Sequence, residues 1–93
     1  QTYRAGALDV KTRAMLGLVA SLVLRCDGCI SYHVAECYKA GVARDAFFEV
    51  FSVGLVVGGS IVIPHLRRAV DFLDTLESAA ADEAPPCADH VAD

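Results

Sequence analysis

Apolar residues recur every three or four positions along most of this chain, which is the spacing of one face of an α-helix. The first series predicts a helix over residues 9–25, and its members are Leu8, Met15, Leu18, Val19, Leu22 and Val23. Asp9 or Thr12 suits the start of this helix, and the Asp9 carboxylate complements the positive end of the helix dipole. No convincing alternation of the kind that marks a β-strand interrupts the pattern. We therefore expect an all-α fold.

The same spacing predicts three further helices. One covers residues 27–39 and stops at Gly41, a residue suited to the left-handed conformation that ends many helices. The next runs from residue 44 to the glycine pair at 58 and 59. Ser60 is expected to cap the last helix, and Pro64 lies in its first turn, where a missing amide donor is tolerated.

These helices are expected to form one small domain, residues 1–78, because 93 residues leave no room for a second core. Residues 79–93 are acidic and broken by two prolines, so we expect a disordered tail. The apolar fraction of 55% is high for a chain that buries proportionally little of its surface. The excess apolar surface predicts a homo-oligomer.

Charge and hydropathy exclude two classes of partner. A net charge of −4 argues against nucleic acid, because phosphate contacts need a basic surface. The apolar runs at residues 14–24 and 50–63 are shorter than the roughly 20 residues of a membrane span. Three of the four cysteines fall within residues 26–37, a pattern more typical of a cytosolic redox or metal motif than of extracellular disulfides. We therefore expect a cytoplasmic protein.

The motif R-C-D-G-C-I-S-Y-H places Cys26, Cys29 and His33 at the start of the second predicted helix. Two thiols separated by two residues can form a disulfide, and a helix start favours the thiolate. Cys29 and His33 are four residues apart, on one helix face, where imidazole can exchange a proton with sulfur. The pattern predicts Cys29 as nucleophile, Cys26 as resolving thiol and His33 as proton donor and acceptor, with no cofactor. The structural alternative is a small buried cysteine and a core histidine.

Metal binding is the chemical alternative for the same residues. Cys29 and Cys37 lie about 12 Å apart along a helix, too far for one zinc ion to bind both sulfurs. Cys26, Cys29 and His33 could still supply three zinc ligands. Cys37 is interpreted as a core residue, and His65 as a packing or interface residue.

From residue 6 to residue 73 the chain resembles the alkyl hydroperoxidase D / carboxymuconolactone decarboxylase-like (AhpD-like) family. The resemblance is carried by G-A-L-D-V-K-T-R-A-M-L-G-L-V-A-S, C-D-G-C-I-S-Y-H-V-A-E-C, K-A-G-V-A-R-D-A-F-F-E-V and V-V-G-G-S. It implies a small helical domain of about four main helices that assembles into trimers or hexamers. In peroxidase members the second cysteine attacks a hydroperoxide, the first resolves it, and the histidine belongs to a proton relay. These roles correspond to Cys29, Cys26 and His33, with a lipoylated or thioredoxin-like reductant.

Two positions depart from the family pattern. A relay glutamate common in peroxidase members is Ala14 here, and a histidine found in some members before the second cysteine is Gly28. Glu36 or Glu49 would have to replace the missing carboxylate. The alternatives to a peroxidase are a redox-sensing or zinc-binding module without turnover, and a decarboxylase-related enzyme that keeps its cysteines.

Overall fold

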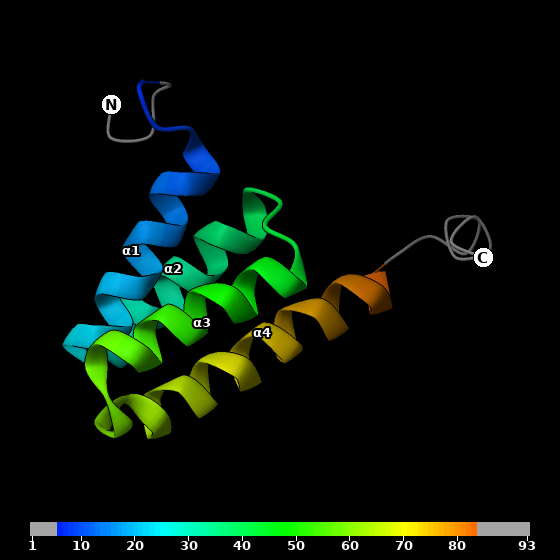
Figure 1. Cartoon of the computed structure of the whole chain (residues 1–93). Helices are drawn as coiled ribbons and strands as arrows, with labels where there is room; N and C mark the ends of the chain where they lie inside the picture. Colours follow the sequence, from blue (N-terminus) through cyan, green and yellow to red (C-terminus); the bar gives the residue numbers. More distant parts are fainter. Residues whose placement is uncertain (1–5, 84–93) are drawn as a thin grey trace.

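The computed structural model describes residues 6–83, which form helices joined by short links (Figure 1). The elements are α1 (Val10–Leu24), α2 (Asp27–Lys39), α3 (Arg44–Gly58), the 3₁₀ turn η1 (Ser60–Val62) and α4 (Ile63–Glu83). This part of the chain contains no strand, so the all-α prediction is confirmed.

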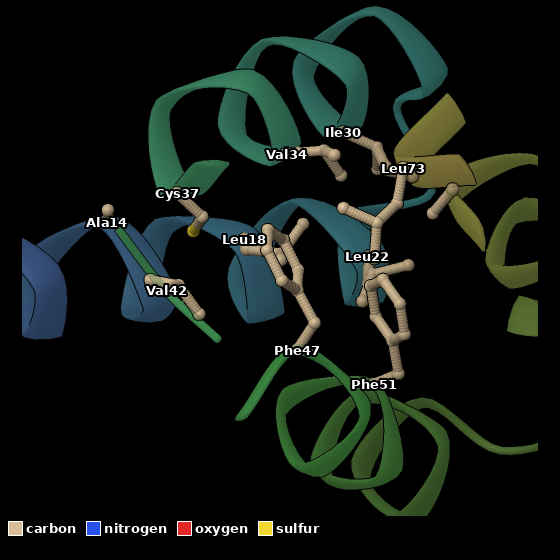
Figure 2. Close-up of a cluster of buried hydrophobic side chains, with 11 residues drawn as sticks. Ala14, Leu18, Leu22, Ile30, Val34, Cys37, Val42, Phe47, Phe51 and Leu73 are labelled. Carbon is tan, nitrogen blue, oxygen red and sulfur yellow. The ribbon is translucent and has the colours of Figure 1, made fainter. Parts of the chain in front are cut away.

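Helix α1 packs against both α2 and α3 (Figure 1). Helix α4 packs mainly against α2. The core fills the space among these helices (Figure 2). Leu18 and Leu22 of the first predicted series belong to it, whereas Leu8 of that series is exposed. The buried members of the core are Ala14, Leu18, Leu22, Ile30, Val34, Cys37, Val42, Phe47, Phe51, Ala69 and Leu73. In the C-terminal half of α4, Asp74 and Glu77 form ion pairs with Arg44 of α3.

Asp9 caps the start of α1, as predicted, by accepting the backbone N–H of Thr12 at 2.7 Å.

The link between α1 and α2 is very short. Arg25 ends the helix in the left-handed conformation, with φ of 59°. The next residue, Cys26, is already the N-cap of α2. The cysteine motif is thus held directly at the end of one core helix and the beginning of another.

The other two links differ in how well they match the sequence prediction. Gly41 follows α2 with φ of 88°, which confirms it as the left-handed stop. The prediction that Ser60 caps the last helix is wrong. Gly59, with φ of 81°, precedes turn η1, and no side chain caps that turn. A glycine is favoured there because other residues adopt this conformation at a cost, and Pro64 still lies in the first turn of α4, as predicted.

Helix α4 continues to Glu83, past residue 78, where the domain was expected to end. The remainder of the predicted tail, including Cys87 and His90, lies outside the described residues. Within residues 6–83, no helix combines the length and the apolar character needed to cross a membrane.

Candidate active site

The cysteine pair lies at the N-terminus of α2. Cys26 is the N-cap, and its Sγ accepts the backbone N–H of Cys29 at 3.3 Å. A cap of this kind satisfies one of the amide groups that have no partner within the helix. Both sulfurs therefore lie at the end of α2 where the helix dipole favours negative charge.

The two sulfur atoms are 2.7 Å apart, and both cysteines are free thiols. The Cys26 and Cys29 thiols are hydrogen-bonded to each other, and Cys26 can accept the Cys29 proton. Cys29 is exposed, whereas Cys26 is half-buried. The structure thus brings together the two sulfurs that the sequence paired, and it leaves one of them open to solvent.

The hydrogen bonds make the two thiols unequal. The pKa of Cys26 is lowered, first because its sulfur accepts the Cys29 thiol and second because it accepts the Cys29 backbone N–H. The pKa of Cys29 is raised, mainly because its thiol proton is bound to Cys26. The first thiolate of the pair is therefore favoured at Cys26, while the more accessible sulfur belongs to Cys29.

His33 lies one turn after Cys29 on α2, and its ring is packed against α1. A Cβ atom built on Gly17 would lie 2.7 Å from both Cε1 and Nδ1 of His33, so the ring occupies the space left by the missing side chain. Tyr32 contacts the ring edge-on, with centroids 5.1 Å apart. Nδ1 is buried without a hydrogen-bond partner among the described residues. The ring of His33 is therefore positioned by packing rather than by a bond from Nδ1.

The carboxylates considered as substitutes for the relay glutamate do not bond to His33 Nδ1 within residues 6–83. Ala14 is 2% exposed and belongs to the core. Glu36 forms an ion pair with Lys39 at 3.3 Å, and Glu49 is exposed on α3. The described chain therefore supplies no carboxylate to this nitrogen.

The third described cysteine has a structural role. Cys37 is fully buried in the core (Figure 2), as the sequence indicated, and burial raises its pKa to about 11. A thiol that resists ionisation is a poor nucleophile and a poor metal ligand. Among residues 6–83, no three His, Cys, Asp or Glu side chains come close enough to hold a metal ion.

One cluster beside the cysteines could not be predicted from their motif. Asp27, the residue after Cys26, is bound by two side chains of α4. His65 Nδ1 lies 2.8 Å from Asp27 Oδ1, and Arg68 donates to Asp27 Oδ2 at 3.1 Å. The pKa of Asp27 is lowered by these two hydrogen bonds, that of His65 first. The only signal in the sequence is His65 itself, for which the sequence predicts a packing or interface role.

The sequence model of the carboxymuconolactone decarboxylase family matches residues 1–72. The fold is similar to a solved protein of that family from Thermotoga maritima, which is described as possibly involved in an antioxidative response. The TM-score is 0.84 and the identity 56%, over 86% of this chain and 82% of that one.

Two more distant similarities agree with this match. A carboxymuconolactone decarboxylase family protein from Legionella pneumophila shares the fold, with a TM-score of 0.74 and 23% identity over 80% of this chain and 66% of that one. An uncharacterized protein encoded in the cox locus of Paracoccus denitrificans is 26% identical over 77 residues. That match covers 83% of this chain and 69% of the Paracoccus protein.

Proposed function

This chain belongs to the carboxymuconolactone decarboxylase family, and we propose that it is a thiol-dependent peroxidase that reduces hydroperoxides with Cys26 and Cys29. The observation that carries the proposal is the pair of free sulfurs 2.7 Å apart at the start of α2, one of them exposed. The antioxidative role suggested for the similar Thermotoga maritima protein supports it. Such a reaction needs an attacking thiolate and a second thiol within bonding reach.

In the proposed reaction Cys29 attacks the hydroperoxide, because its sulfur is the exposed one. When Cys26 is the thiolate, transfer of the Cys29 thiol proton to the Cys26 sulfur, 2.7 Å away, leaves Cys26 as a neutral thiol and Cys29 as the attacking thiolate. The thiolate attacks the terminal oxygen, the O–O bond breaks, an S–O bond forms, and the leaving alkoxide takes a proton to become the alcohol. The product is a sulfenic acid at Cys29.

Cys26 then resolves this product. Its sulfur attacks the sulfenic sulfur of Cys29, an S–S bond forms, and the hydroxyl leaves as water after taking a proton. A dithiol, either a lipoyl group or a thioredoxin-like protein, reduces the disulfide and becomes oxidised in turn. The chemistry uses no cofactor, and we place it in the cytoplasm, where such reductants keep thiols reduced.

His33 is proposed to pass protons in both steps. It lies one turn from Cys29, and its buried Nδ1 has no partner among the described residues. One water molecule is enough to connect an imidazole to a reacting group that it does not touch.

The test is a thiol titration before and after addition of cumene hydroperoxide. The wild-type protein should lose the thiols of Cys26 and Cys29 together. Cys29→Ser should lose neither through peroxide, and Cys26→Ser should stop at a sulfenic acid that dimedone traps on Cys29. Cys37→Ala is the control, because that thiol is buried outside the site and its loss should leave the reaction intact. Peroxide-dependent oxidation that persists in Cys29→Ser would refute the assignment.

A redox sensor without turnover is the second candidate, favoured by the buried Ala14 in place of the relay glutamate. Excess dithiothreitol separates the two functions. A peroxidase continues to consume hydroperoxide as long as dithiol is supplied, whereas a sensor oxidises once and is reduced too slowly for sustained consumption. A plateau after one equivalent of peroxide per chain would favour the sensor.

A further inference from the structure

Asp27 is a negatively charged residue that lies in the sequence between the two cysteines of the motif. Its carboxylate is half-exposed and lies in the first turn of α2, which also carries Cys29 and follows Cys26. A negative charge at this position opposes formation of a thiolate beside it. The Asp27 charge does raise the pKa of Cys26, although the hydrogen bonds from Cys29 outweigh this effect.

Two side chains of α4 contact this carboxylate, each at a different oxygen. His65 Nδ1 is 2.8 Å from Asp27 Oδ1, and Arg68 Nη2 is 3.1 Å from Asp27 Oδ2. The side chain of His65 is 20% exposed, so its ring is largely held by the protein. Arg68 also approaches His65 Nδ1 at 3.2 Å, so the three side chains form one cluster.

The geometry determines which tautomer His65 adopts. A nitrogen 2.8 Å from a carboxylate oxygen donates its proton to that oxygen, so Nδ1 carries a hydrogen. The arginine beside it cannot donate to the same nitrogen and is bound instead by the second carboxylate oxygen. Both α4 side chains therefore act as donors to Asp27.

We propose that His65 and Arg68 are positioning residues for the cysteine pair: both hold the Asp27 carboxylate, which directly follows Cys26 in the chain, and Arg68 offsets its negative charge. This role rests on the proposed function, because it concerns the ionisation of the same two thiols. Helix α4 has no cysteine among its described residues. Under this proposal it nevertheless helps the cysteine pair at the start of α2 to ionise. The same contacts join the start of α4 to the start of α2.

The test measures the rate of alkylation by iodoacetamide at neutral pH, which follows the thiolate fraction. All variants carry Cys87→Ser, and Cys37 does not interfere because its pKa is about 11. Arg68→Gln should slow alkylation of the pair about threefold, the size expected for one exposed charge. Asp27→Asn should accelerate it by a similar factor. Arg67→Gln is the matched control, since it removes the same charge from the neighbouring exposed position.

The opposite signs distinguish a charge effect from a merely structural one. Asp27→Asn and Arg68→Gln break the same ion pair, so a structural role would move alkylation in the same direction in both variants. The charge effect also predicts that Arg68→Gln slows alkylation only while the Asp27 carboxylate is present. Equal rates for Arg68→Gln and Arg67→Gln would overturn the proposal. So would an Arg68→Gln effect of undiminished size in a protein that also carries Asp27→Asn.

The outcome does not depend on peroxidase activity. If the alkylation pattern appears but no hydroperoxide is consumed, the positioning role stands and the proposed function falls. If hydroperoxide is consumed but the variants show no pattern, the function stands and the positioning role falls.

Discussion

At the scale of single residues, Cys26 performs two tasks with one sulfur atom. As the N-cap of α2 it accepts the Cys29 backbone N–H, and as one of the thiol pair it is hydrogen-bonded to the Cys29 thiol. The capping bond fixes the side-chain rotamer that the second contact needs. A serine at this position could cap the helix equally well but could not form a disulfide, which makes Cys26→Ser a mild structural change and an informative chemical one.

Gly17 has a comparable role toward His33. Any side chain at residue 17 must displace the imidazole, because a Cβ atom there would lie 2.7 Å from two ring atoms. Gly17→Ala should change the free energy of unfolding by less than about 2 kcal/mol, since the gain in helix propensity offsets part of the overpacking. It should slow peroxide-dependent thiol oxidation about tenfold or more, since general acid–base catalysis is worth at least that much.

Urea unfolding and stopped-flow oxidation of the same samples measure these two quantities. Gly6→Ala serves as the control, because a Cβ atom at residue 6 meets nothing within 4 Å. If Gly17→Ala oxidises at the wild-type rate, His33 does not take part in the reaction from its observed position.

The residues of the site differ in how far they could be predicted from sequence. The pairing of Cys26 with Cys29 follows from local spacing, because residues three apart at a helix start lie close together. The packing of His33 on Gly17 depends instead on how α1 and α2 cross. The contact of Asp27 with His65 joins residues 38 positions apart on different helices, so no local pattern could have revealed it.

At the scale of helices, the sequence prediction was most accurate where a helix end has its own chemical signal. The bounds predicted for α2, residues 27–39, are those observed, because Gly41 and the cysteine motif mark its two ends. The prediction was wrong at Ser60, where the chain needs a positive φ at Gly59 and a 3₁₀ turn before it can enter α4. Serine is a residue type that often caps helices, but the backbone conformation of the preceding Gly59 starts a 3₁₀ turn at Ser60 instead.

The link from α2 to α3 provides a test of this argument. Gly41 has φ of 88°, and its N–H donates to the carbonyl of Tyr38 at 3.1 Å. Gly41→Ala should lower the free energy of unfolding by about 1 kcal/mol, because an L-residue in this conformation is strained. Gly41→Asn should lose less, since asparagine tolerates the left-handed region. Chemical denaturation measures both, and an unchanged midpoint for Gly41→Ala would contradict the argument.

At the scale of the whole molecule, one apolar face of the domain is left uncovered. Val53, Val56 and Val57 on α3 are 51%, 83% and 66% exposed, and Leu16 on α1 is 52% exposed. Leu16 and Val53 also line an open groove of about 220 Å³ between the two helices. We refer to these four residues as the α1–α3 apolar surface. Contiguous apolar surface of this kind usually marks a protein–protein contact.

A second copy of this chain is the expected partner for the α1–α3 apolar surface, in agreement with the homo-oligomer predicted from composition. Val56→Glu should dissociate the oligomer, because burying an unpaired carboxylate in an apolar interface costs about 3–5 kcal/mol. Such a cost weakens association by roughly a hundredfold or more. Light scattering coupled to size-exclusion chromatography should then report a smaller mass for Val56→Glu. Ser78→Glu on the exposed part of α4 adds the same charge away from this surface and should leave the mass unchanged. A wild-type protein that is monomeric at high concentration would contradict the predicted homo-oligomer.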